Sequence, residues 1–221
     1  MGLIDLLFPK TCVSCGKFGS YICENCVKKI EYLDTQVCSE CYKGAIGGQT
    51  HPYCQKRYGL DGVISLVNYK SPVREMIQQL KYRFTTNLLD EISQKLVFDQ
   101  DLVRNRKWTV LPLPLHVSRQ NFRGFNQAEL LGKIVADKLN LNFDNKTLIK
   151  TAKTKPQVGL NKNERKDNVV GVFEITRKLE SDAYFIFDDV WTSGASLKSA
   201  AEQLKKAGVK TVWGLTLAHP R

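Results

Sequence analysis

The feature that most constrains the fold of this chain is a continuous apolar run that ends in two adjacent carboxylates. Residues 184–187 read Tyr-Phe-Ile-Phe, residues 188–189 are both Asp, and residues 192–194 read Thr-Ser-Gly directly before a helical pattern. Four apolar residues in a row are typical of a strand buried on both faces, as in the parallel sheet of an α/β domain. We expect a hydroxyl of Thr192 or Ser193 to cap the helix that follows.

The turn between this strand and helix predicts a phosphate site, because N–H groups and hydroxyls at a helix start bind anions. The carboxylates before the turn accept hydrogen bonds from a vicinal diol. Phosphoribosyl pyrophosphate (PRPP) combines a phosphate with ribose hydroxyls and fits both features. The alternative is an acidic strand end before an ordinarily capped helix. The candidate residues are Asp188 and Asp189 for the ribose, and Thr192, Ser193, Gly194, Ala195 and Ser196 for the phosphate.

The length and the net charge of the chain limit its possible domain organisation and partners. The chain has 221 residues, which is long enough for one α/β domain and a small module. No apolar run approaches membrane-spanning length, and residues 1–9 carry Asp5 and no basic segment, so we expect a cytoplasmic protein without membrane insertion. The net charge of +11 favours a polyanionic partner. The basic residues are densest in 146–178, where the alternative is a solvated loop.

All seven cysteines lie before residue 55 and form a metal-binding pattern. Three Cys-x-x-Cys pairs are followed by a His-x-x-Cys, so that eight ligands are available for two tetrahedral zinc ions. The odd number of cysteines argues against a disulfide framework. A cross-braced pairing, redox thiols or one empty site are the alternatives. We prefer a sequential arrangement, with Cys12, Cys15, Cys23 and Cys26 around one structural zinc ion and Cys38, Cys41, His51 and Cys54 around the other.

The cysteine pattern divides the chain into a double zinc ribbon at residues 1–58 and an α/β domain at residues 59–221. In the larger part we expect strands at 62–69, 108–115 and 211–217, and a helix that starts at Ser71-Pro72. The second of these strands leads through a Pro-rich exit into a basic loop and a further helix. The polar and basic stretch 153–173 suggests a lid over an anionic substrate, and its alternative is a surface loop before a strand.

The segment around the acid pair resembles the PRPP-binding signature of type I phosphoribosyltransferases. That resemblance implies the type I phosphoribosyltransferase fold, a parallel sheet flanked by helices, and Mg²⁺ bound together with PRPP. Trp191 departs from the signature, where a small aliphatic residue is usual, and we expect it to narrow the ribose side or to offer a stacking surface. The pyrophosphate or lid positions are Lys81, Arg119, Arg123 and Arg165.

The whole chain is similar to the ComF competence-protein family. The similarity rests on the Cys-rich N-terminus and on five blocks in order: Leu80-Lys81-Tyr82, Leu111-Pro112-Leu113-Pro114, Arg123-Gly124-Phe125-Asn126-Gln127, Pro156-Gln157 with Arg165 and Asn168-Val169, and Phe187-Asp188-Asp189 with Thr192-Ser193-Gly194. The resemblance implies a zinc module joined to a phosphoribosyltransferase-like domain, with a role in DNA uptake during natural transformation beside a DNA-translocating helicase. It leaves three hypotheses: a transferase acting on an unidentified acceptor, outside DNA uptake; a PRPP-binding module whose basic loops hold single-stranded DNA; or a scaffold with a vestigial pocket.

Overall fold

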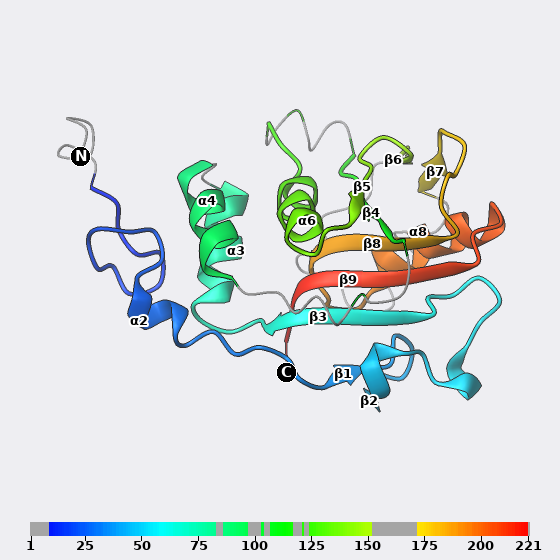
Figure 1. The fold of residues 1–221 in the computed structure, drawn as a ribbon, viewed down its shortest axis with the longest axis horizontal. Helices are drawn as coiled ribbons and strands as arrows, with labels where there is room; N and C mark the ends of the chain where they lie inside the picture. Colours follow the sequence, from blue (N-terminus) through cyan, green and yellow to red (C-terminus); the bar gives the residue numbers. More distant parts are fainter. Residues whose placement is uncertain are drawn as a thin grey trace.

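A five-stranded parallel sheet forms the centre of the larger domain (Figure 1). The structure, a computed structural model, describes residues 9–82, 86–96, 103, 107–116, 121, 124–151 and 172–220. The sheet has the strand order β3-β9-β8-β4-β5. Its strands are β3 (Gly62–Asn68), β4 (Thr109–Pro112), β5 (Asn142–Phe143), β8 (Ala183–Val190) and β9 (Thr211–His219).

Helices cover both faces of this sheet, because the side chains of β8 alternate between two apolar cores. Phe185 and Phe187 pack with the helices α3 (Val73–Tyr82), α4 (Thr86–Lys95) and α6 (Gln127–Lys138). Tyr184 and Ile186 pack with α8 (Ala195–Lys206) on the opposite face. All four side chains are buried, as the apolar run predicts. The predicted α/β class with a parallel sheet flanked by helices is confirmed.

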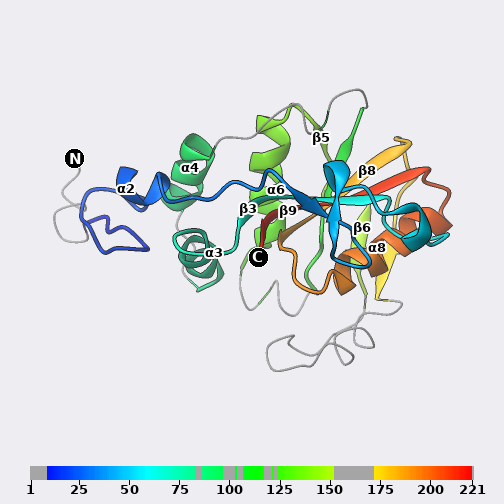
Figure 2. The ribbon, with the colours of Figure 1, turned by 90° about the horizontal axis from the view of Figure 1, so that it is seen from below.

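The N-terminal zinc module lies along one edge of this domain and not apart from it. It contains α2 (Glu24–Val27), the paired strands β1 (Gln36–Val37) and β2 (Gly44–Ala45), and short 3-10 turns at Ile46–Gly48 and Pro52–Cys54. The segment between its two halves runs antiparallel beside β3, with the N–H of Leu33 donating to the carbonyl of Leu66 at 3.0 Å (Figure 2). Because β3 is an edge strand, this segment covers backbone groups that would otherwise lie exposed.

Several details of the fold refine the sequence expectations. The predicted strand at 108–115 is shorter, since only Thr109–Pro112 pairs with β8. A small antiparallel pair, β6 (Leu148–Lys150) and β7 (Phe173–Ile175), flanks the basic stretch whose residues 152–171 lie outside the described part of the chain. Among the helices that the structure describes, none combines the length and apolarity needed to cross a membrane. The boundary at residues 58–59 stays a prediction.

Candidate functional site

The two carboxylates and the turn after them surround one small cavity. Asp188 and Asp189 lie near the carboxyl end of β8, which is hydrogen-bonded to β9 on one side and to β4 on the other, so the backbone that carries them is fixed. The cavity has a volume of about 130 Å³ and is lined by residues 188–190 and 192–197. All seven residues that the sequence assigned to ribose and phosphate are therefore brought together at the carboxyl end of one central strand. That is the edge at which open α/β sheets bind ligands.

Gly194 is the N-cap of α8 and adopts a left-handed conformation with φ of 64°. Neither Thr192 nor Ser193 occupies the N-cap position, since Gly194 does and has no side chain to cap with. The predicted hydroxyl contact is nevertheless present, because Ser193 Oγ accepts a hydrogen bond from the N–H of Ala195 at 3.5 Å. N–H groups and hydroxyls at a helix start that lines a cavity are the arrangement that an anion site requires.

Trp191 lies beneath the turn and has no exposed surface. A Cβ atom added to Gly194 would fall 2.1 Å from Trp191 Cη2, so the indole packs directly against the glycine. The expectation that Trp191 faces the ribose or offers a stacking surface is therefore wrong. Its ring instead faces the zinc module, where the ring of Tyr42 lies 6.2 Å away between centroids.

The exit of the neighbouring strand β4 is tied to the start of α6 beside this cavity. The N–H of Leu113 donates to the carbonyl of Phe187 at 2.8 Å, which places the β4 exit next to Asp188. Asn126 caps α6 by accepting from the N–H of Ala128, and its side-chain amide donates to the carbonyl of Leu113 at 3.1 Å. This structural role of Asn126 had a sequence signal, since Asn directly before a helical pattern is a preferred N-cap.

The four side chains predicted to hold pyrophosphate or to close over it lie outside the described part of the structure. Arg119, Arg123 and Arg165 lie outside the described residues, and so does most of the proposed lid. Lys81 belongs to the last turn of α3, on which only the backbone is described. Their roles stay predictions.

The cysteines and the histidine form two separate four-ligand clusters in the sequential arrangement. In each cluster all ligand atoms lie within 4.8 Å of one another. Zn–S bonds of about 2.3 Å in a tetrahedron separate neighbouring sulfurs by about 3.8 Å. The 3.6 Å between Cys15 Sγ and Cys23 Sγ matches that spacing. The clusters are Cys12, Cys15, Cys23 and Cys26, and Cys38, Cys41, His51 and Cys54.

The surroundings of these ligands favour a bound cation. Burial opposes ionisation of Cys12, but backbone N–H groups of Cys23, Cys15 and Ser14 outweigh it and lower the pKa of Cys12 to about 6. Burial and hydrogen bonds with the side chains of Cys15, Cys23 and Cys12 raise the pKa of Cys26 to about 12. In the second cluster His51 Nδ1 lies 3.3 Å from Cys41 Sγ, while Nε2–H donates to the carbonyl of Gly44 at 3.0 Å. This second hydrogen bond orients the ring toward zinc. The ligands therefore fit two structural zinc ions.

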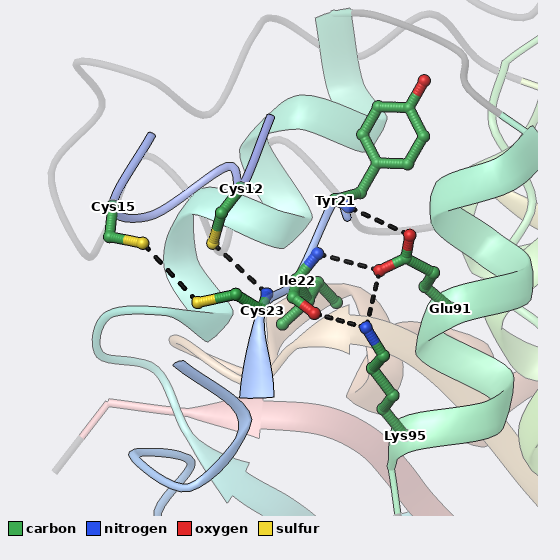
Figure 3. A network of polar contacts seen from close by, with 7 residues as sticks. All are labelled: Cys12, Cys15, Tyr21, Ile22, Cys23, Glu91 and Lys95. Atoms are coloured by element: carbon green, nitrogen blue, oxygen red, sulfur yellow. Dashed lines mark hydrogen bonds and ion pairs between the residues drawn. The ribbon is translucent and has the colours of Figure 1, made fainter. Parts of the chain in front are cut away.

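Each zinc cluster is anchored to the α/β domain by its own contacts. The Glu91 carboxylate of α4 accepts hydrogen bonds at 2.9 Å from the N–H groups of Tyr21 and Ile22, directly before Cys23 (Figure 3). Lys95 completes this anchor by bonding both Glu91 Oε2 and the carbonyl of Ile22. Burial acts to raise the pKa of Glu91, but the hydrogen bonds from Lys95 and the two N–H groups hold it below its usual value.

The second cluster is anchored at the candidate phosphate turn. Tyr42 follows the ligand Cys41 directly, and its hydroxyl donates to the carbonyl of Ser193 at 2.7 Å. Burial, together with the charge of Glu40, raises the pKa of Tyr42, so the hydroxyl keeps its proton. Glu40 also lies 3.4 Å from Lys198 Nζ in the first turn of α8. No sequence pattern predicted these contacts.

Comparisons with known proteins agree with this two-part organisation. Residues 3–56 match the double zinc ribbon domain family. Competence protein F of Haemophilus influenzae is 26% identical over 229 residues, covering 91% of this chain and 99% of the relative. The predicted resemblance to ComF proteins is confirmed. Competence protein ComFC of Streptococcus pneumoniae is 20% identical over 90% of the chain and 88% of its own length. DNA utilization protein YhgH of Salmonella typhi is 27% identical over 86% of the chain and 87% of its own length. The similarity to ComF proteins therefore extends well beyond the zinc module into the α/β domain.

Proposed function

We propose that this chain is a PRPP-binding, phosphoribosyltransferase-like protein that acts in DNA uptake. One observation carries the proposal: two carboxylates and the start of a helix line the same cavity at the carboxyl end of β8. A diol and a phosphate on one ligand fit these two groups at once. The role in DNA uptake is supported by the relatives, which are named competence proteins and DNA utilization proteins.

In the bound state the ribose hydroxyls donate to Asp188 and Asp189, and the 5′-phosphate accepts from the N–H groups and hydroxyls of residues 192–196. Mg²⁺ bound together with PRPP would supply positive charge that stabilises the leaving pyrophosphate, and the carboxylates of Asp188 and Asp189 are protein ligands of the kind that Mg²⁺ prefers. If the protein turns over, an acceptor attacks C1 of the ribose, the C1–O bond to pyrophosphate breaks, and pyrophosphate leaves with the bonding electron pair. Arg119, Arg123 and Lys81 are the candidates for holding it, and Arg165 for closing over it.

Isothermal titration of PRPP with Mg²⁺ tests the binding proposal. We expect saturable binding to the wild type, and none to a protein carrying both Asp188→Asn and Asp189→Asn. The matched control is Asp182→Asn, which neutralises an exposed carboxylate just before the other end of β8. Equal binding by the wild type and the double variant would refute the assigned site. Release of pyrophosphate during incubation would favour the transferase hypothesis over pure binding.

A groove beside the cavity carries cationic and aromatic side chains that suit contact with single-stranded DNA. The groove has a volume of about 530 Å³ and is lined by Lys56, Arg57, Tyr58 and Lys198, and also by Glu40 and Glu202, so its excess of positive charge is small. Ser193 and Ala195 line both the groove and the cavity, so the two hollows share a wall. Cationic and aromatic side chains in one groove suit a sugar–phosphate chain with stacked bases.

Fluorescence anisotropy with a labelled single-stranded oligonucleotide tests the DNA proposal. We expect affinity to fall steeply as salt rises, and to weaken at every salt concentration when Lys56 and Arg57 are both changed to Ala or when lysines of 146–178 are removed. Binding that is insensitive to salt, or that survives both sets of changes, would contradict it.

The zinc module is also the proposed contact for a DNA-translocating helicase. It carries several strongly exposed large apolar side chains, namely Phe18 at 70%, Tyr53 at 80% and Ile46 at 97% exposure. We expect Ile46→Ser to weaken binding to the purified helicase in surface plasmon resonance while both zinc ions are retained. Unchanged affinity in this variant and in Phe18→Ser would argue against docking at the ribbon.

A further inference from the structure

Tyr42 connects the second zinc site directly to the candidate phosphate turn. It has a left-handed backbone with φ of 62°, which is uncommon for a residue with a large side chain. The cysteine knuckle, which we define as residues 38–43, fixes this backbone conformation. The N–H of Tyr42 donates to the carbonyl of Cys38 at 3.1 Å, and the N–H of Cys38 donates to the carbonyl of Lys43 at 2.8 Å. The direction of the Tyr42 side chain is thus set by the loop that carries two of the zinc ligands.

The hydrogen bond from Tyr42 fixes one peptide plane of the turn. Its hydroxyl donates to the Ser193 carbonyl at 2.7 Å. In a trans peptide the C=O of one residue and the N–H of the next point in opposite directions. With the Ser193 carbonyl turned toward Tyr42, the N–H of Gly194 must point away from the zinc module. Gly194 lines the cavity, so the contact behind the turn decides where this donor is directed.

Two further contacts reinforce the same connection. The ring of Trp191 packs directly against Gly194 and lies near the ring of Tyr42. Because this space is filled, the turn cannot move toward the zinc module. Lys198 Nζ lies 5.3 Å from the Tyr42 ring centroid and 5.9 Å from that of Trp191, and it pairs with Glu40 of the knuckle. The turn is therefore supported from behind by a cluster built on the second zinc site.

We propose that Tyr42 is a positioning residue through which the second zinc site orients the phosphate-binding turn. This inference rests on the proposed function for the identity of the ligand, but the positioning of the turn is measurable without any ligand. It assigns the second zinc ion a task beyond folding of the ribbon. Bound zinc fixes the conformation of the knuckle, and the knuckle sets the direction of the Tyr42 side chain. The hydrogen bond from Tyr42 then orients the peptide whose N–H belongs to Gly194.

The test compares Tyr42→Phe with Tyr53→Phe in the full chain. Both changes remove one hydroxyl at the second zinc site, but the ring and hydroxyl of Tyr53 contact His51 and not the turn. Three quantities are measured: zinc stoichiometry by native mass spectrometry, hydrogen exchange of a peptide spanning 191–198 without ligand, and PRPP affinity with Mg²⁺ by calorimetry.

We expect Tyr42→Phe to keep two zinc ions, to exchange the turn amides about fivefold faster and to bind PRPP about fivefold more weakly, the loss expected for one neutral hydrogen bond. Tyr53→Phe should match the wild type in all three measurements. Unchanged exchange and affinity in Tyr42→Phe would overturn the proposal, and so would loss of a zinc ion from that variant or equal effects from both. A wild type that fails to bind PRPP would refute the proposed function alone, because the exchange data would still decide the role of Tyr42.

Discussion

At the scale of single residues, Gly194 is the most constrained position of the candidate site. Its φ of 64° disfavours any residue with a side chain, and a Cβ there would overlap the buried ring of Trp191. We expect Gly194→Ala to destabilise the protein by about 2–5 kcal/mol, since backbone strain and overpacking add. Thermal unfolding of the zinc-loaded protein should show a midpoint lowered by roughly 5–15 °C.

Gly208 provides a matched control for that substitution. It follows the other end of α8 and has φ of 94°, but no atom lies within 4 Å of its added Cβ. Gly208→Ala should therefore show the backbone strain alone, about 1–2 kcal/mol. If both variants lost the same free energy of unfolding, the predicted overlap between the added Cβ and Trp191 would make no contribution to stability.

The residues of the cavity were predictable because their signal is local. The acid pair and the turn sit within ten positions of one another, after an apolar run that predicts a buried strand. The support behind them was not predictable, since Tyr42 and Ser193 are 151 positions apart and meet only in the folded chain. Trp191 was misplaced for the same reason. The side chain of Trp191 points away from the cavity and toward Tyr42 of the zinc module, which the local sequence does not indicate.

At the scale of elements, long periodic segments were the most predictable. The expected helix after the acid pair corresponds to α8, with Leu197, Ala200, Ala201 and Leu204 all buried. β5 gave no signal, because it has only two residues, pairs with β4 alone and cannot show an alternating pattern. The N-cap residue of α8 was predicted wrongly because hydroxyl residues are among the commonest caps, whereas this helix has a left-handed glycine there and Ser193 accepts from the N–H of Ala195 from one position earlier.

The anchor between α4 and the first zinc cluster depends on the charge of Glu91. Its folded pKa is lowered, so the stabilisation is present at neutral pH and is lost as pH falls through the folded pKa, which lies below the ordinary value of about 4.3. We expect Glu91→Gln to cost about 1–2 kcal/mol at pH 7, measured as a lower unfolding midpoint. The difference between variant and wild type should begin to shrink as the pH falls through the ordinary value of about 4.3, and should vanish once the pH lies below the lowered pKa of the folded protein.

Glu202→Gln is the control for this prediction. Glu202 pairs with Lys206 at 2.7 Å with the same i,i+4 spacing as Glu91 and Lys95, but on the exposed surface of α8. Such surface pairs contribute little, so Glu202→Gln should leave the midpoint within about 1 °C at every pH. A pH-independent deficit in Glu91→Gln would show that its carboxylate charge is not what holds the zinc ribbon.

At the scale of the whole molecule, the two zinc clusters support different parts of the α/β domain. The first meets α4 through Glu91, and Ser14 between its ligands lies 2.9 Å from Ser71 ahead of α3. The second meets the candidate phosphate turn through Tyr42. Between them, the chain follows the edge strand β3 (Figure 2). The zinc module thus contacts the α/β domain in two separate regions. Loss of one zinc ion should lower the local stability only of the region that its cluster contacts.

Removing one zinc ligand at a time tests this division. Cys15→Ser and Cys41→Ser should each leave one zinc ion per chain, because a four-ligand site that lacks one thiolate binds its ion far more weakly. Hydrogen exchange followed by mass spectrometry should then separate them. Cys15→Ser is expected to lose protection in 21–30 and 86–96 with the turn unchanged, whereas Cys41→Ser loses protection in 191–198 and keeps α4. If both variants lost protection in the same segments, the module would unfold as one cooperative unit, and the division of labour between its zinc ions would be refuted.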